Sequence, residues 1–425
     1  MSIIQIPTLH EGQAKIYKER SRRNVIRCGR RFGKTKMSVA FSCDAAAKGK
    51  KVGLFAPEHK QLQEPYDEIL AALKPIIVSS NKTDGVIKTT TGGKVDFWRL
   101  TDNELAGRGR EYDLVIIDEA AFTKNGQMID IWNKSIVPTM ATRPKATIWV
   151  MSTPRGIDEE NFFYQLCHDA EFGFKEFHAP SWSNPLVSGE WLESEKNRMH
   201  PDVWRQEVLA EFVSWDGTSF FSIDKMLQDG TPVDFPTRCE GVYAVIDSAT
   251  KTGKEHDGTG VIYFAFQKWP YPRLFILDYD LVQIEGALLE TWLPTVYQNL
   301  EHLAREAGAR GGSLGAFIED KASGMVLLQQ AKRRGWKAHP LDTAFTALGK
   351  DERAISVSGY VYQGLVKFTV KAFDKLVNFK GRQLNHMVSQ VSSFRVGDKN
   401  ANRADDLLDC MVYGTAIAFG NKVGF

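Results

Sequence analysis

The residues best suited to chemistry in this chain lie at positions 24–37, where the sequence reads NVIRCGRRFGKTKM. The apolar pair at 25–26 predicts a buried strand, and a basic loop containing two glycines follows at 28–33. A helix is then expected over residues 34–47, with Gly49 as its stop. A loop that leads from a buried strand into a helix N-terminus presents free backbone N–H groups, which bind phosphate oxygens.

The side chains of this loop fit the binding of a nucleoside triphosphate, which we take to be ATP. Lys34 would reach the β- and γ-phosphates, and the Thr35 hydroxyl would hold Mg²⁺. Gly29 and Gly33 belong to the same expected phosphate-binding loop. The spacing departs from G-x-x-x-x-G-K-T, because Cys28 occupies the first glycine position and Gly29 follows it. The alternative is a basic strand–turn–helix of an ordinary α/β fold.

Two further strands are expected to end beside this loop. The continuous apolar run 114–117 predicts a strand buried on both faces, which delivers Asp118 and Glu119 at its carboxyl end. Asp118 would bind Mg²⁺ through water, and Glu119 would orient and deprotonate the water that attacks the γ-phosphate. A third strand ends at Ser152 and Thr153, where a strand end could sense the γ-phosphate and pass its loss on to other segments.

Several arginines could neutralise the charge that develops on the transferred phosphoryl group. Arg30 and Arg31 lie inside the loop, so one of them can act within the same chain. Arg108 lies in a glycine-rich turn before the second strand and is suited to reach a neighbouring subunit. We favour Arg30 and Arg108, and the alternative for each is a surface salt bridge. Gln13, upstream of the loop, is either a contact to the adenine edge or a solvated side chain.

Composition limits the classes of protein that remain. The chain has 425 residues, of which 43% are hydrophobic and 25% charged, so about two or three domains are expected. No apolar run of about 18 residues is present, so we expect no membrane span. Five scattered cysteines without a C-x-x-C pair argue against a disulfide framework and a zinc site, and favour a reducing cytoplasm. The net charge of +2 requires any nucleic-acid surface to be a local patch.

A segment rich in Gly, Pro, Thr and Asp predicts a linker at 214–238, between a first domain at 1–213 and a second domain at 239–425. The second domain begins with three consecutive expected strands within 241–282, joined by short turns as an antiparallel meander. A helix, a fourth strand and a late acidic helix follow. This order of elements is the ribonuclease H-like layout.

Acidic residues end the expected strands of the second domain or open its last helix, namely Asp247, Glu319, Asp320, Asp405, Asp406 and Asp409. Burying such an acid is costly unless a metal ion compensates its charge. Carboxylates that converge without His or Cys suit Mg²⁺ or Mn²⁺. Two such ions about 4 Å apart can clamp the attacking and leaving oxygens of a phosphodiester displacement. For the three late aspartates the alternative is favourable charge at a helix N-terminus.

Six motifs in this order, CGRRFGKT, LVIIDEAA, STPRG, AVIDSA, FIEDKASG and DDLLDCMVYG, resemble the large terminase subunit of tailed double-stranded DNA bacteriophages. The resemblance covers nearly the whole chain. It implies an α/β protein with a RecA-like (ASCE P-loop) packaging ATPase domain followed by a ribonuclease H-like (RuvC-like) nuclease domain.

The resemblance also implies roles for individual residues. The ATPase motifs match at Lys34, Thr35, Asp118 and Glu119, and the coupling motif matches at Ser152 and Thr153. An arginine in the loop is typical of the family and favours Arg30. The nuclease acids match at Asp247, at Glu319 and at the late aspartates. Spacing to Gly324 favours Glu319 over Asp320, and we favour Asp406 and Asp409 over Asp405, with Asp247, Glu319 and Asp409 as the catalytic acids.

The activity implied is a motor that uses ATP and Mg²⁺ to push double-stranded DNA through a portal protein into a procapsid, with no membrane partner. A nuclease using Mg²⁺ or Mn²⁺ would cut concatemeric DNA when packaging starts and ends. A homo-oligomeric ring, expected as a pentamer, would dock at the portal vertex in the host cytoplasm, and a small terminase subunit would mark the DNA. The alternatives are a helicase or repair ATPase whose second domain only binds DNA, and a capsid-assembly scaffold with a nucleotide switch.

Overall fold

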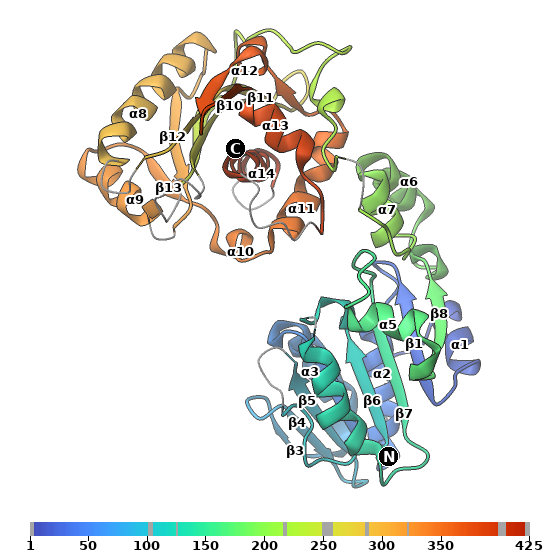
Figure 1. The fold of residues 1–425 in the computed structure, drawn as a ribbon. Helices are drawn as coiled ribbons and strands as arrows, with labels where there is room; N and C mark the ends of the chain where they lie inside the picture. Colours follow the sequence, from blue (N-terminus) through green and yellow to red (C-terminus); the bar gives the residue numbers. More distant parts are fainter. Residues whose placement is uncertain are drawn as a thin grey trace. The chain divides into compact units, whose positions relative to one another are not determined.

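A computed structural model describes residues 4–100, 105–124, 126–215, 219–248, 258–284, 289–320, 323–397 and 405–420. The chain forms two compact units (Figure 1). The first contains Met1–Asn197 and Pro201–Ser214, and the second contains Arg198–His200 and Trp215–Phe425. None of the helices in the described ranges combines the length and the apolar character needed to cross a lipid bilayer.

The first unit is built on a sheet of eight strands, which are β1 (Arg23–Cys28), β2 (Lys51–Ala56), β3 (Ile77–Asn81), β4 (Val86–Thr89), β5 (Lys94–Arg99), β6 (Leu114–Asp118), β7 (Thr147–Ser152) and β8 (Lys175–Ala179). Their order in the sheet is β3-β4-β5-β2-β6-β7-β1-β8. The run from β5 to β8 is parallel, and β3 and β4 form an antiparallel edge. Strands β6 and β7 lie between β1 and β2, which is the predicted RecA-like arrangement.

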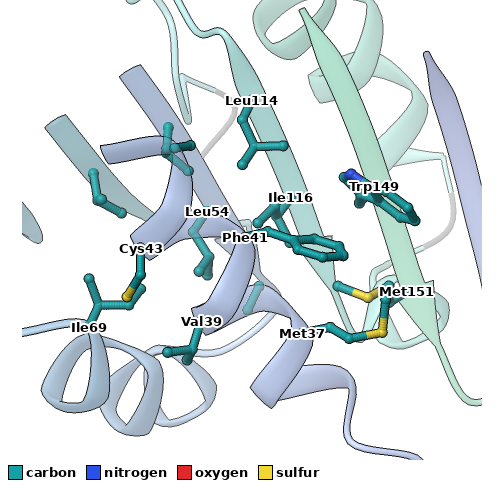
Figure 2. Close-up of a cluster of buried hydrophobic side chains, with 14 of the residues drawn as sticks. Met37, Val39, Phe41, Cys43, Leu54, Ile69, Leu114, Ile116, Trp149 and Met151 are labelled. Atoms are coloured by element: carbon teal, nitrogen blue, oxygen red, sulfur yellow. The ribbon is translucent and has the colours of Figure 1, made fainter. Parts of the chain in front are cut away.

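Helices cover both faces of this sheet, with α1 (Glu11–Lys18), α2 (Lys34–Ala47) and α3 (His59–Leu73) in one core and α4 (Gln127–Ile131) and α5 (Phe162–His168) in the other. Helices α6 (Gly189–Arg198) and α7 (Pro201–Glu207) follow β8 in the chain and lie beyond the end of the sheet (Figure 1). Helix α2 is buried on most sides because the sheet covers one face and α3 another, so its sequence lacks a polar stripe. Figure 2 shows this core, where the ring of Phe41 packs 4.8 Å from that of Trp149 and Met37 approaches Met151. This packing fixes the direction in which the N-terminus of α2 points.

The sheet of the second unit has six strands, which are β9 (Gly241–Asp247), β10 (Thr259–Gln267), β11 (Arg273–Val282), β12 (Ser313–Ile318), β13 (Ala338–Pro340) and β14 (Val366–Phe368). Their order is β13-β12-β9-β10-β11-β14. Strands β9, β10 and β11 are antiparallel neighbours, so the predicted meander is confirmed, and β12 runs parallel to β9. This is the expected ribonuclease H-like fold. A separate hairpin pairs β15 (Val377–Phe379) with β16 (Arg382–Leu384).

The helices of the second unit are α8 (Leu289–Glu306), α9 (Ser323–Arg333), α10 (Thr343–Thr346), α11 (Lys350–Tyr362), α12 (Val370–Asp374), α13 (His386–Ser393) and α14 (Asp406–Phe419). Alternate residues of β9 serve the two faces of the sheet. Val242 and Ala244 pack in one apolar core with α8. On the other face, the Tyr243 hydroxyl donates a 2.7 Å hydrogen bond to the Gly414 carbonyl of α14. The last helix is therefore held directly against the central strands.

Residues 219–238, which the sequence analysis assigns to a linker, pack into the second unit. Phe220 and Phe221 are buried, and Phe220 donates its backbone N–H to the Phe394 carbonyl at 3.0 Å. A short 3₁₀ helix, η7 (Ile223–Met226), places Met226 in the interior. The segment is rich in polar turn residues, but its few buried apolar residues attach it to the second unit.

Gly414 allows α14 to approach the sheet, and we predict that Gly414→Ala destabilises the second unit. A Cβ atom at this position would lie 2.3 Å from the Phe264 ring, which is itself fully buried and has little room to move. We expect a loss of about 1–3 kcal/mol, visible as a lower melting temperature of the full chain. Gly189→Ala is the matched control, because a Cβ there meets nothing within 4 Å. Equal melting of the two variants would contradict the close approach.

Candidate functional site

The loop between β1 and α2 depends on glycine at two positions. A Cβ on Gly29 would lie 2.5 Å from both the Val208 carbonyl oxygen and the Ser181 hydroxyl. Gly33 caps α2 with a φ of +94°, which side chains rarely tolerate. Arg31 also has a positive φ, of 64°. The backbone is thus bent tightly around the N-terminus of α2, where free N–H groups are available to an anion.

Gln13 is buried rather than solvated, with 2% of its surface exposed. Its Nε2 atom donates to the Phe32 carbonyl at 3.3 Å and to the Gly33 carbonyl at 2.9 Å. Its Oε1 atom accepts from the His10 backbone N–H at 3.1 Å. The amide of Gln13 therefore braces the loop from α1, and the adenine contact stays a prediction.

Side chains from three neighbouring strand ends meet beside the loop, because β6, β7 and β1 are adjacent in the sheet. Lys34 Nζ lies 3.2 Å from Glu119 Oε1 and donates to Thr153 Oγ1 at 3.1 Å. The Thr35 hydroxyl lies 3.4 Å from Asp118 Oδ2. A hydroxyl and a carboxylate at this separation fit the hard oxygen donors that Mg²⁺ prefers.

Ser152 connects the end of β7 to the turn that follows β6. Its fully buried hydroxyl accepts from the Ala121 N–H at 3.1 Å and lies 3.4 Å from Glu119 Oε2. It also contacts the Thr153 carbonyl at 2.8 Å. Glu119 itself adopts a left-handed φ of 53°, which turns its carboxylate toward Lys34. These contacts link the end of β7 to the turn that follows β6.

The electrostatics of this site favour the binding of cations. Burial and then the neighbouring Glu119 raise the pKa of Asp118 to about 7, while Lys34 opposes the shift. Burial alone would lower the pKa of Lys34, but Cys28, Glu119 and Asp118 together hold it above its ordinary value. The crowded carboxyls therefore need positive charge, which Lys34 supplies only in part.

The arginines are placed differently from one another. Arg30 pairs with the Glu207 carboxylate on α7, and its backbone N–H donates to the Glu207 carbonyl at 2.7 Å. Arg31 is exposed, and its carbonyl accepts from Asn184 Nδ2 at 2.7 Å. Arg108 is exposed on its turn, where its backbone N–H bonds to the Leu105 carbonyl at 2.9 Å. Sequence reasoning missed Glu207, because no motif links it to the loop.

In the second unit, acidic residues lie together at the carboxyl ends of β9 and β12 and at the start of α14. Strands β9 and β12 are parallel neighbours, so Asp247 and Glu319 leave the sheet side by side. Helix α14, packed on β9 and β10, brings in Asp406 and Asp409. Asp406 is buried, and its Oδ2 accepts from the Gly258 N–H at 3.1 Å. The structure therefore brings together acids that are far apart in the sequence.

The mutual repulsion of these acids is visible at Asp247. Burial, and then Asp409, Asp406 and Glu319, hold the pKa of Asp247 well above its ordinary value, while Lys350 opposes the shift. Each of these groups is therefore an electrostatic neighbour of Asp247. Their carboxylate oxygens fit Mg²⁺ or Mn²⁺ by donor chemistry, and a bound cation would relieve the repulsion.

The two remaining candidate metal ligands, Asp320 and Asp405, have different surroundings. Asp320 is exposed, and Asp405 pairs with Lys350. Sequence reasoning missed two basic side chains of α11. Lys350 contacts Asp405, and Arg353 Nη2 lies 3.1 Å from Asp409. Across the ranges that the structure describes, no three His, Cys, Asp or Glu side chains are already arranged to hold a metal ion. The acidic side chains of the second unit therefore lie beside two positively charged side chains, Lys350 and Arg353.

Comparison with known proteins finds a family that is similar to the first unit. Residues 25–228 match the family described as terminase large subunit, T4likevirus-type, N-terminal. Just under half of this chain is thus similar to the amino-terminal part of terminase large subunits. The matched residues begin inside β1 and include the loop, both acids after β6 and the end of β7.

Individual terminases agree with this assignment. The large subunit of Thermus virus P23-45 is 25% identical over an alignment of 265 residues that covers 51% of this chain and 51% of that protein. The large subunit of Escherichia phage T5 is 24% identical over 173 residues, 40% of this chain and 39% of that protein. This chain thus matches about half, or less, of the length of these curated terminases.

The terminase fold extends over both units. The large terminase of a thermophilic bacteriophage superposes with a TM-score of 0.67 at 13% identity, covering 96% of this chain and 98% of that chain. The same thermophilic phage protein in complex with ADP gives a TM-score of 0.67 at 14% identity, covering 96% and 99%. The ribonuclease H-like unit is therefore part of the shared fold.

We predict that Asp247→Asn stabilises the protein when divalent cations are removed by EDTA. The substitution replaces a carboxyl group whose ionisation is disfavoured by burial and by its acidic neighbours with a neutral amide of nearly the same shape. The melting temperature should rise by an amount that corresponds to about 1–2 kcal/mol. Asp320→Asn serves as the control, because Asp320 is exposed and its loss should leave melting unchanged. A lower melting temperature for Asp247→Asn would contradict the repulsion.

Proposed function

We propose that this protein is the large subunit of a phage terminase, which uses ATP to move viral double-stranded DNA through a portal into a procapsid and cuts concatemeric DNA when packaging starts and ends. The observation that carries the proposal is the meeting of Lys34, Asp118 and Glu119 at neighbouring strand ends. The family match over residues 25–228 supports it.

The proposed ATPase step follows from the geometry of the first unit. The loop N–H groups and Lys34 bind the phosphates, while Thr35 and Asp118 hold Mg²⁺, which when bound neutralises phosphate charge. Glu119 accepts the proton of the attacking water once phosphate has drawn Lys34 away from it. Arg30 reaches the developing charge after it leaves Glu207. Structures of the thermophilic phage's large terminase with ADP and with ATP-γ-S support nucleotide binding here.

Coupling to movement begins at the end of β7. Thr153 contacts Lys34 at 3.1 Å, and Ser152 contacts the turn that carries Glu119, so both strand ends respond when the γ-phosphate is lost. Further along, the Gly156 N–H donates to Gln206 Oε1 at 2.8 Å on α7. These links give the change a direct route to α7.

The proposed nuclease step belongs to the second unit. Asp247, Glu319, Asp406 and Asp409 would hold Mg²⁺ or Mn²⁺, which when bound stabilises the attacking and leaving oxygens of the phosphodiester. Asp320 and Asp405 lie outside this group by exposure and by pairing with Lys350, respectively. Asp247 and Glu319, at the ends of β9 and β12, and the two aspartates of α14 would all be ligands of the metal.

The partners follow from the same proposal. They are double-stranded DNA, the portal protein, the procapsid and a small terminase subunit, in the host cytoplasm and at the portal vertex. A homo-oligomeric ring, expected as a pentamer, would let one subunit serve the ATP site of the next. Arg108 is exposed between Gly107 and Gly109, which both have positive φ, and this exposure suits such a contact.

We predict that Glu119→Gln binds ATP but hydrolyses it about 10²–10⁴-fold more slowly, because the amide cannot accept the proton of the attacking water. Phosphate release and binding of a fluorescent ATP analogue measure the two properties separately. Glu176→Gln is the matched control, since Glu176 pairs with Arg27 within the sheet. Turnover close to that of the unmodified protein would remove Glu119 as the base.

We predict that Asp409→Asn abolishes Mn²⁺-dependent cutting of plasmid DNA, because it removes a ligand that α14 aims at the site. Asp320→Asn should cut normally, and so should Lys34→Ala, which affects only the other unit. Gel electrophoresis of supercoiled plasmid checks all three. Cutting that survives in Asp409→Asn but disappears in Asp320→Asn would overturn the assignment of the acids.

A further inference from the structure

Helix α11 presents two cations to the acids of α14. Lys350, its first residue, pairs with the Asp405 carboxylate and lies 3.8 Å from Asp409 Oδ2. Arg353, one turn later, approaches the other oxygen of Asp409, with Nη2 at 3.1 Å from Oδ1. Positive charge from the protein itself therefore lies against Asp409, which is proposed to bind metal, and against its neighbour Asp405.

The two cations are held to different degrees. The Arg353 side chain is only 11% exposed, its guanidinium lies 5.1 Å from the centre of the Tyr413 ring, and its Nη1 donates to the Leu348 carbonyl at 2.9 Å. The Lys350 side chain is 30% exposed and sits at the very start of its helix, after Gly349. Arg353 is thus fixed by packing, whereas Lys350 can swing into solvent at low cost.

Electrostatics explain why a cation is needed here. Carboxylates gathered in a partly buried site repel each other and lose hydration, so the fold requires a compensating charge. A divalent cation supplies that charge better than one ammonium group, and it would bind Asp409, whose Oδ2 lies 3.8 Å from Lys350 Nζ. The ammonium and the metal ion therefore compete for Asp409.

We propose that Lys350 is the built-in counter-cation of the nuclease site: it compensates the late aspartates in the metal-free protein and leaves them when a divalent cation binds, while Arg353 holds Asp409 in both states. The inference rests on the proposed nuclease function. It makes Lys350 the residue that sets the metal concentration at which the site fills.

The first test is calorimetric titration of the full chain with MnCl₂. Lys350→Ala removes the competitor, so Mn²⁺ should bind about 3- to 10-fold more tightly than to the unmodified protein. Lys371→Ala is the matched control, because Lys371 pairs with Asp278 at 3.4 Å on another part of the same unit and its loss should leave Mn²⁺ affinity unchanged. Unchanged or weaker Mn²⁺ binding in Lys350→Ala overturns the proposal.

A second measurement uses the unmodified protein and does not depend on how the variant folds. Acetylation of lysine amines, followed by mass spectrometry, should modify Lys350 faster when MnCl₂ is present, while Lys371 reacts at the same rate in both conditions. If the acetylation rate of Lys350 is the same with and without MnCl₂, the proposal that Mn²⁺ displaces Lys350 is overturned.

The two levels of proposal fail in different ways. An unmodified protein that shows no Mn²⁺ binding sensitive to Asp247→Asn overturns the nuclease site, and this inference with it. Binding that is sensitive to Asp247→Asn but indifferent to Lys350 overturns this inference alone.

Discussion

Uncompensated negative charge at the ends of buried strands is the constraint on which both proposed sites depend. A parallel strand buried on both faces must be apolar along its length, so polar groups gather where it ends. In the first unit that position holds Asp118 and Glu119, and in the second it holds Asp247 and Glu319. In each unit a neighbouring helix brings positive charge to the acids, from Lys34 in the first and from Lys350 in the second.

The two units meet this requirement with the same device. A lysine at the first position of a helix faces the acids in both, Lys34 on α2 and Lys350 on α11. Lys34 reaches Glu119 at the end of the adjacent strand, and Lys350 reaches aspartates that open a second helix. In both places an ammonium group lies where phosphate or metal is proposed to bind. Substrate binding can then rearrange ion pairs without unfolding any secondary structure.

Sequence reasoning succeeded where chemistry is local. The apolar runs and the acids that follow them predicted β6, β9 and β12, and the basic glycine loop predicted the start of α2. The edge strands β3 and β8 escaped prediction, because their side chains are largely exposed and show no apolar run. The RecA-like and ribonuclease H-like folds could be assigned mainly because the order of motifs matched a known family.

What the sequence could not supply were the partners of each charged group. Glu207 and Arg353 have no signature, since their roles arise only when distant elements pack together. The choice between Glu319 and Asp320 likewise turns on which side of the strand end faces the core, and exposure places Asp320 outside. Phe220 and Phe221 were hidden among turn residues, although their burial ties 219–238 to the second unit.

The brace that Gln13 forms with the loop has a consequence for nucleotide affinity. A glycine-containing loop normally samples many conformations, and ordering it on binding would cost conformational entropy. Here the amide of Gln13 holds two loop carbonyls in place from α1, so much of that ordering is complete when the domain folds. The anion cradle is therefore preorganised, and nucleotides can exchange at each cycle without the loop having to refold around them.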